Sequence, residues 1–346
     1  MASGQPTLDA CLMAVDEVNS NGGILVNGER RPIRLFVEDS GGVPEVAVSK
    51  AMGLISRHRV VAILGPTISR DAIAVSKVAE ERQVPMLATM ATHPEVTADK
   101  RYAFRMIFTD ALQAQLLAEI TFNDFGLRRT ALVIEAGRVY SLNFGRLFTQ
   151  AYTRLGGEIV AEVSVISEQE QYDSQAIELF AADPEAILLP ITPNLLEPLF
   201  VAIGHADLRS KILGTDAWGA GDFPPDPSRL DSHYTDVWLP TMTDSASVNF
   251  VESYQKRYGL TANNAAALAY DATRLLARVI EEKGADPESI RQGLATTENF
   301  HGVAGTVRFS GHGDPWRSTV LIRVDKDGQR HIVKRLEPRK EAEPGS

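Results

Sequence analysis

The sequence has very little cysteine, few aromatic residues, no long apolar run and no surplus of basic charge. Among 346 residues there is a single cysteine, so an intrachain disulfide is excluded and the redox compartment cannot be inferred. No apolar stretch approaches the roughly 20 residues needed to cross a bilayer. The opening residues, MASGQPTLDA, have neither the basic start nor the apolar core of a secretion signal. We therefore expect that the chain as written neither spans a membrane nor directs its own export.

The net charge is unfavourable for nucleic-acid binding. The formal charge is -10, and the Lys and Arg residues are scattered without forming a basic stripe, so the chain would repel a phosphate backbone. A hydrophobic content of 44% with 23% charged residues is instead typical of a packed globular protein. At this length we expect two domains rather than one.

Motifs for catalysis and metal binding are also scarce. The seven histidines form no HExxH pair, and neither a GxSxG elbow nor a GxxxxGK[ST] phosphate loop is present. The glycines of Gly219–Gly221 lack the third glycine and the strand-to-helix context of a dinucleotide fingerprint. We therefore expect no enzyme activity, no cofactor and no metal.

The first 240 residues show the pattern of an α/β protein. Short apolar runs alternate with amphipathic helical stretches such as Val46–Ile55 and Asp71–Arg82, which indicates parallel strands joined by crossover helices. Ligands bind to such sheets at the carboxyl ends of the strands. The predicted strands are Ile33–Val37, Val60–Leu64, Pro85–Ala88, Thr130–Ile134, Ile159–Val163, Ala186–Leu189 and Lys211–Gly214.

After Pro240 the pattern changes to consecutive helices followed by short strands. These late helices need a sheet to cover, and the earlier strands can supply two. A chain that completes one α/β lobe, builds a second and then returns to the first would explain this order. The predicted elements are helices Ala246–Tyr258, Asn264–Lys283 and Pro287–Ala295, strands Gly305–Phe309 and Thr319–Val324, and a hairpin turn at Asp325–Gly328 into Gln329–Leu336.

Eight segments in one order resemble a known family. They are LMAVDEVNSNGGI, RLFVEDS, AILGPTISRDA, VPMLATMATHPEVT, the pair Tyr140–Ser141, GTDAW at Gly214–Trp218, AALAYDATRLL and FHGVAGTVRFSGHGD. This order resembles the type I periplasmic binding proteins, and in particular the substrate-binding proteins of ABC transporters for the branched-chain amino acids leucine, isoleucine and valine. The resemblance covers residues 4–335 and implies two Rossmann-like three-layer lobes joined by a three-strand hinge.

The resemblance implies a division of the chain into lobes. The first lobe would consist of residues 1–109 and 241–315, and the second of residues 110–240 and 316–340, with 341–346 as a flexible tail. The three hinge strands would then pass near Phe108–Asp110, Leu239–Thr241 and Pro315–Ser318.

One departure from the family concerns the first strand. Family members begin with a secretion signal and a strand ahead of the segment that SGQPTLDA resembles, whereas this chain starts after that point. A sheet without a central strand would expose paired edges and apolar surface. We therefore expect truncation rather than a tolerated loss, and a periplasmic or cell-surface location for the protein.

In the first lobe the resemblance implies a carboxylate-binding site. Ser69 follows the strand VVAIL near a helix start, where free N–H groups and the helix dipole attract anions. The family also uses backbone at the position of Met90, and both backbone and side chain at that of Thr92. The alternatives are that Ser69 or Asp71 only starts the helix, and that Thr92 only forms a turn ahead of Pro94.

In the second lobe the resemblance implies contacts to the rest of the ligand. Asp216 would bind a ligand ammonium group, with a solvated loop acid or a cap as the alternative. Trp218 would either form a wall of the pocket or pack beneath the loop. Tyr140 and Ser141 begin a helix where family members often contact ligand, and Ser141 could instead be an N-cap.

These residues predict a binding protein without chemistry. Ligand held by both lobes would stabilise a closed form that docks on an ABC transporter permease. The segment LLPITPN has Thr192 and Pro193 where amino-acid binders often have a tyrosine, so other small carboxylates remain candidates. The alternative function is a ligand-sensing domain of a receptor or regulator with the same fold.

Overall fold

The computed structural model describes residues 4–167, 169, 171–206, 208–221, 231–325 and 327–336. They divide into two compact units, each with its own core. In the described ranges, unit 1 contains residues 4–109 and 240–318, and unit 2 contains residues from 110 to 239 together with 319–336. Within these ranges no helix is both long enough and apolar enough to span a membrane.

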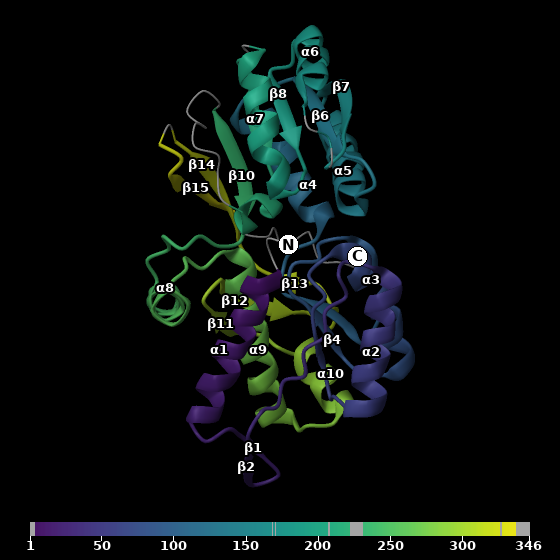
Figure 1. The fold of residues 1–346 in the computed structure, drawn as a ribbon, viewed down its shortest axis with the longest axis vertical. Helices are drawn as coiled ribbons and strands as arrows, with labels where there is room; N and C mark the ends of the chain where they lie inside the picture. The colour runs from purple at the N-terminus through teal and green to yellow at the C-terminus, as the bar shows by residue number, and fades with distance from the viewer. Residues whose placement is uncertain are drawn as a thin grey trace. The chain divides into compact units, whose positions relative to one another are not determined.

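Unit 1 is built around a short parallel sheet. Strand β3 (Ile63–Leu64) pairs with β4 (Met86–Ala88), and β4 pairs with β5 (Ala103–Arg105). Helices α2 (Pro44–His58) and α3 (Ser69–Arg82) pack together against this sheet through small and branched apolar residues, in a core that includes Ala47, Ala51, Val75, Ala79, Met86 and Ala88. Figure 1 shows α2 and α3 on one side of β4 and two further helices on the other.

Those two further helices are α1 (Gly4–Ser20) and α9 (Asn264–Lys283), which pack side by side. The run of alanines at the start of α9 is fully buried, and its small side chains allow this close packing. The remaining elements of the unit are helices α8 (Ser245–Tyr258) and α10 (Pro287–Ala295), the hairpin β1 (Ile24–Val26) and β2 (Glu29–Arg31), and the antiparallel strands β11 (Phe300–Gly302), β12 (Gly305–Phe309) and β13 (Pro315–Trp316).

Capping residues explain where the late helices begin. Asp244, Asn263 and Asp286 precede α8, α9 and α10, and each accepts a hydrogen bond of 3.0 Å from the N–H group three residues further on. This is the preferred chemistry of an N-cap, because it satisfies a donor that has no partner within the helix.

The predicted strand Ile33–Val37 is wrong. These residues form no ladder with any other described residue, although the Asn19 side chain donates to the carbonyl of Ile33 at 2.9 Å and accepts from its N–H at 2.7 Å. An apolar run becomes a strand only where a neighbouring strand pairs with it. In the part of the chain that the structure describes, no strand pairs with this run, and Val37 is 55% exposed.

Unit 2 contains a seven-stranded mixed sheet in the order β15-β14-β10-β9-β8-β6-β7. The five strands from β7 to β10 are parallel, and β14 and β15 extend the sheet in antiparallel pairing. The strands are β6 (Arg129–Glu135), β7 (Glu158–Val165), β8 (Ala186–Leu189), β9 (Lys211–Gly214), β10 (Ser232–Asp236), β14 (Thr319–Val324) and β15 (Arg330–Leu336). The α/β fold class is thereby confirmed.

Helices cover the sheet of unit 2. Helices α4 (Asp110–Glu119) and α5 (Val139–Arg154) pack against β6, β8 and β9 through a core rich in aromatic residues, which includes Phe144, Phe148 and Tyr152. Helices α6 (Asp173–Ala182) and α7 (Leu196–His205) pack against each other. The carboxyl ends of β6, β8, β9 and β10 carry the polar residues of the site described next.

Candidate functional site

The start of α3 in unit 1 presents main-chain donors and a hydroxyl. The N-cap position is Ile68, whose side chain cannot cap, so the first N–H groups of the helix receive no side-chain acceptor from it. Ser69 is the first helical residue and is 6% exposed, and Asp71 is two residues further on. Neither Ser69 nor Asp71 is therefore the N-cap. The arrangement leaves positive charge at this helix end, where an anion would be stabilised.

The loop after β4 lies at the same edge of the sheet. Met90 is half-buried and Thr92 is 1% exposed. His93 is the N-cap of the short 3-10 helix Pro94–Val96, and its Nδ1 accepts from the N–H of Glu95 at 3.2 Å. The cap of this helix is therefore His93 rather than Thr92, and a ligand contact of Thr92 stays a prediction.

Thr89 in the same loop was not identified from the sequence. Its side chain is fully buried, and its Oγ1 has no hydrogen-bond partner among the residues that the structure describes. A buried hydroxyl of this kind costs about 1–3 kcal/mol unless a ligand or water satisfies it. It adds a third hydroxyl to those of Ser69 and Thr92.

Arg105 holds the loop after β4 in place through hydrogen bonds, and it was also not identified from the sequence. Its fully buried guanidinium donates to the carbonyl oxygens of Ala91 and His93 at 2.9 and 3.0 Å, and to Thr97 Oγ1 at 2.6 Å. Its Nε donates to Asp314 at 2.7 Å. Because these bonds hold the carbonyl groups of the loop on the Arg105 side, they fix the orientation of its peptide units.

Three buried aspartates form the centre of the polar site in unit 2. Asp110 begins α4, Asp216 follows β9, and Asp236 ends β10, and each is at most 3% exposed. Burial and the negative charges of Asp236 and Asp110 hold the pKa of Asp216 well above its usual range. A cation bound beside Asp216 would offset this repulsion and favour the ionised form of its carboxyl group.

Neutral polar groups complete this cluster. Gln113 donates to Thr235 Oγ1 at 2.9 Å, Asn143 donates to Asp110 at 2.9 Å, and the Tyr140 hydroxyl donates to Thr215 Oγ1. Burial, followed by the charges of Asp216 and Asp110, raises the pKa of Tyr140 well above its usual value. Tyr140 thus stays a neutral hydrogen-bonding group beside the aspartates.

Trp218 anchors the loop that carries Asp216. Its ring is fully buried, its Nε1 donates to the carbonyl of Leu189 at 3.1 Å, and it contacts the rings of Phe200 and Tyr234. A Cβ at Gly214 would lie 2.3 Å from this ring, so glycine is required there. Trp218 packs beneath the loop, and its contact with a ligand stays a prediction.

Ser141 is also fully buried. Its Oγ accepts from the N–H of Glu135 at 2.9 Å, and it lies within the first turn of α5, after the N-cap position Arg138. Ser141 is therefore not an N-cap, and its hydroxyl joins the end of β6 to the start of α5. Its predicted ligand contact remains untested.

Glu135 connects three loops of unit 2. It is 1% exposed and accepts from Arg138 Nε at 3.0 Å, from Ser167 Oγ, and from both the N–H and the hydroxyl of Thr192 at 2.9 Å. No local sequence pattern indicates this role, because the partners of Glu135 are spread from residue 138 to residue 192. Glu135 fixes the ends of β6 and β8 that carry Tyr140 and Thr192.

The two units thus offer complementary chemistry. Unit 1 presents N–H and hydroxyl donors suited to a carboxylate, and unit 2 presents a buried carboxyl group suited to an ammonium group. Among the described residues, no group of three or more His, Cys, Asp or Glu side chains is arranged to hold a metal ion.

Comparisons with known proteins agree in fold and family. A family model described as periplasmic binding protein matches residues 1–329. The Leu/Ile/Val-binding protein BraC3 of Rhizobium johnstonii is 34% identical over 139 residues, which are 39% of this chain and 36% of that protein. The matched segments span little more than a third of the length of the first curated relatives, 36% and 37%.

Two solved structures share the fold over nearly their whole length. The leucine-binding protein LivK from Thermotoga maritima superposes with a TM-score of 0.84 at 24% identity, covering 97% of this chain and 95% of that one. A solute-binding protein of an ABC transporter from Rhodopseudomonas palustris, in complex with 3,4-dihydroxybenzoic acid, has a TM-score of 0.84 at 18% identity, covering 98% and 94%.

Proposed function

The chain belongs to the periplasmic binding protein family, and from this premise we propose that it is the solute-binding protein of an ABC importer. It binds a small carboxylate, with an amino acid as the first candidate, and delivers it unchanged to a transporter permease. It acts outside the cytoplasm and catalyses no reaction. The observation that carries this proposal is the pair of complementary polar clusters at strand ends of the two units.

The carboxylate of the ligand binds to unit 1. The uncapped N–H groups at the start of α3, the Ser69 hydroxyl and the Thr92 loop provide donors, and Met90 contributes main chain. Donors fixed in advance lose little entropy on binding, and Arg105 supplies that rigidity for the loop.

The ammonium group of the ligand binds to unit 2. Asp216 pairs with it as a carboxylate, with Tyr140 as a neighbouring hydroxyl, while Ser141 and Trp218 hold the surrounding main chain. A ligand held by both clusters favours the state in which both can reach it, because only that state makes both sets of contacts. We infer that this state is the one recognised by the permease.

The ligands named for similar proteins share a carboxylate. The Rhizobium relative is named for leucine, isoleucine and valine, and the Rhodopseudomonas structure holds 3,4-dihydroxybenzoic acid, which has no amino group. The carboxylate is therefore the common requirement, and the presence of Asp216 favours a ligand that also carries an ammonium group.

Binding measurements on an Asp216→Asn variant separate these two requirements. Wild type and variant are titrated calorimetrically with L-leucine and with 3,4-dihydroxybenzoate. Loss of the charged contact should weaken the binding of an amino acid by about tenfold to a hundredfold, which corresponds to about 1.4–3 kcal/mol. The exposed Glu197→Gln change in the same unit is the matched control and should leave affinity unchanged. An amino acid that binds equally well to wild type and to the Asp216→Asn variant would remove Asp216 from the site.

A further inference from the structure

Arg138 is the only Lys or Arg that the structure describes in the loops after the five parallel strands of unit 2. Ligands bind to an open α/β sheet at the carboxyl ends of its parallel strands, where these loops lie. The described residues that follow β6, β7, β8, β9 and β10 are 136–141, 166–167, 169, 171–172, 190–195, 215–221 and 237–239. An anionic group of a ligand that reaches these loops therefore meets the side chain of Arg138.

A buried glutamate fixes the direction of the Arg138 side chain. The Nε of Arg138 donates to Oε1 of Glu135 at 3.0 Å, and the Glu135 side chain is 1% exposed. Ser167 and Thr192 hold Glu135 in turn through hydrogen bonds to its two oxygens. A guanidinium that is attached to a fixed carboxylate loses little further entropy when it binds an anion. Arg138 is therefore preorganised, unlike an arginine that is surrounded by water.

The outer edge of the Arg138 guanidinium has no partner in the described part of the protein. Of the N–H donors of this side chain, the bond to Glu135 uses only the one on Nε. Neither Nη1 nor Nη2 donates to a described residue, and the side chain is 42% exposed. Arg138 is the N-cap residue of α5, but its side chain makes no capping bond. The two Nη groups therefore remain as a planar fork, the geometry that binds a carboxylate in a bidentate manner.

The start of α5 also contacts the loop that carries Asp216. Tyr140, two positions after Arg138, donates its hydroxyl to Oγ1 of Thr215, which directly precedes Asp216. Neighbouring loops of one unit thus carry side chains of opposite charge. Asp216 attracts a cationic group and Arg138 attracts an anionic one. A ligand that carries both an ammonium group and a second carboxylate would satisfy the two side chains.

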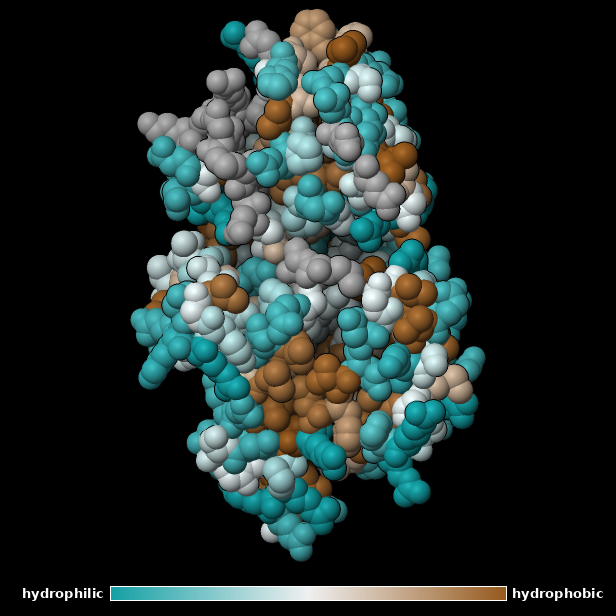
Figure 2. Space-filling view, viewed as in Figure 1, coloured by the Kyte–Doolittle hydropathy of each residue, from teal (hydrophilic) through white to brown (hydrophobic). Residues whose placement is uncertain are grey.

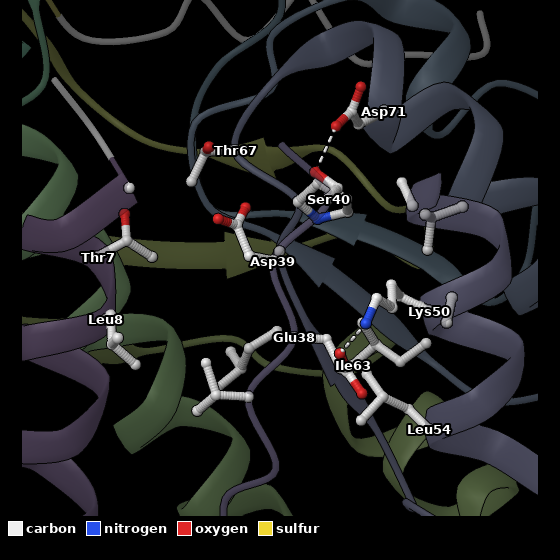
Figure 3. A pocket seen from close by; sticks show the side chains of 18 of the residues that line it. Thr7, Leu8, Glu38, Asp39, Ser40, Lys50, Leu54, Ile63, Thr67 and Asp71 are labelled. Atoms are coloured by element: carbon white, nitrogen blue, oxygen red, sulfur yellow. Dashed lines mark hydrogen bonds and ion pairs between the residues drawn. The ribbon is translucent and has the colours of Figure 1, made fainter. Parts of the chain in front are cut away.

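The start of α3 in unit 1 lies beside a pocket that is unfavourable for a second carboxylate. Figure 3 shows this pocket between α1, α2 and β3. Apolar residues such as Leu8, Leu54 and Ile63 line it, and Figure 2 shows apolar residues gathered on the face of unit 1 next to α1. The charged residues of its lining are three acids and one lysine: Glu38, Asp39, Asp71 and Lys50. The surplus of negative charge would repel a second carboxylate.

The cationic side chains near the start of α3 are already engaged within unit 1. Lys50 Nζ pairs with Glu38 Oε2 at 2.6 Å, as Figure 3 shows. Arg70 donates from Nη2 to the carbonyl of Gly42, and its Nε lies 3.8 Å from Oδ1 of the buried Asp71. A second carboxylate would have to compete with these partners, whereas the outer edge of Arg138 is open.

We propose that Arg138 is a specificity-determining residue that binds the side-chain carboxylate of an acidic amino acid. The inference rests on the proposed function, which assigns the first carboxylate of the ligand to unit 1 and its ammonium group to Asp216. It narrows the preferred ligands to amino acids with a second carboxylate, and glutamate is the probe. Glutamine has the same shape but no second charge, so it cannot form the same charge-assisted bonds with Arg138.

Calorimetric titration of the full chain tests the proposal. Wild type and variants are titrated with L-glutamate, L-glutamine and L-leucine, and the ratio of the dissociation constants for glutamine and glutamate is the readout. Arg138→Gln removes the charge, and Arg138→Lys keeps the charge but lacks the planar fork. The matched control is Arg154→Gln, which changes an exposed arginine at the other end of α5. Because the ratio is measured within each variant, a general loss of stability does not alter it.

We expect wild type to bind glutamate at least about tenfold more tightly than glutamine or leucine. In Arg138→Gln the preference for glutamate over glutamine should fall to about twofold or less, and Arg138→Lys should keep an intermediate preference. The affinity for leucine should change by less than about threefold in Arg138→Gln, because leucine has no second carboxylate. Arg154→Gln should keep the preference of wild type.

Two results would overturn this inference and leave the proposed function intact. The first is that wild type binds leucine but shows no preference for glutamate. The second is a preference for glutamate that is unchanged in Arg138→Gln, which would show that Arg138 only neutralises Glu135. If none of the three amino acids binds to wild type, both the inference and the choice of an amino acid as the first candidate ligand are overturned.

Discussion

Thr192 donates both its N–H and its hydroxyl to Oε2 of Glu135, each at 2.9 Å, although the two residues are 57 positions apart. This pair joins the loop after β8 to the end of β6. Since Glu135 also accepts from Arg138 and Ser167, one buried carboxylate organises three loops of unit 2.

Replacing the carboxylate of Glu135 should lower the stability of the fold. Glu135→Ala removes the shared acceptor of Arg138, Ser167 and Thr192, and we expect the free energy of unfolding to fall by about 1–3 kcal/mol in urea denaturation. Glu162→Ala, at an exposed position of β7, is the control and should change it by less than about 0.5 kcal/mol. Equal losses for the two variants would show that the hydrogen bonds of Glu135 do not stabilise the unit.

The packing of Trp218 on Gly214 gives a second test. Gly214→Ala places a Cβ 2.3 Å from the buried ring, so the ring and the Asp216 loop must move. We expect a loss of about 1–3 kcal/mol in stability and weaker ligand binding. Gly204→Ala in α7 meets no atom within 4 Å and should stabilise slightly, by about 0.5–1 kcal/mol. The melting temperatures of both variants are measured by thermal unfolding. Equal shifts in the two variants would contradict this role for Gly214.

Two buried groups should give opposite pH dependences of stability. Burial raises the pKa of Asp271 from 3.8 to about 6, so between these values the folded state holds more protons and stability falls as pH rises. Burial, followed by the charge of Lys211, lowers the pKa of His233 from 6.5 to about 4. In that window the unfolded state holds more protons, and stability rises with pH.

Single substitutions separate the two groups, each of which changes the free energy of unfolding by about 3 kcal/mol across its pH window. Asp271→Asn should make stability rise more steeply than wild type between pH 4 and 6, and His233→Gln should make it rise less or fall. Each variant serves as the control for the other. The midpoint of denaturant unfolding is measured across this pH range. If its dependence on pH is the same in both variants as in wild type, the two pKa shifts are contradicted.

Ligand binding should release a proton from Asp216. Burial, followed by the charges of Asp236 and Asp110, holds its pKa well above the usual range, so we expect pairing with an ammonium group to favour its ionised form. The calorimetric enthalpy should then depend on the ionisation enthalpy of the buffer, and the affinity for an amino acid should rise with pH. An Asp216→Asn variant should lose the buffer dependence. Identical enthalpies in phosphate and Tris for wild type would contradict this coupling.

Much of the fold could be predicted from the sequence where periodicity and caps agree. Asn264–Lys283, Pro287–Ala295 and Thr319–Val324 have the predicted bounds. Strand β10 was missed because SHYTD reads as polar, although all five residues are buried between β9 and β14. The Ile33–Val37 prediction failed because an apolar run predicts a strand but does not provide its pairing partner.

The site could be predicted only in part. Residues that follow strands, such as Ser69 and Asp216, are visible as local patterns. Arg105 and Glu135 are not, because their roles depend on partners up to 209 and 57 residues away. Likewise, the buried surroundings of Trp218 and Ser141 follow from packing rather than from any local signal.

The central claim is that unit 1 binds a ligand carboxylate, and calorimetric titration with leucine, isoleucine and valine beside their carboxamides tests it most directly. The carboxamides keep the ammonium group and the side chain but lack the anionic charge. We predict that at least one free amino acid binds and that its carboxamide binds at least about a hundredfold more weakly, a difference of about 2.7 kcal/mol. Free acids that bind no better than their carboxamides would contradict the claim.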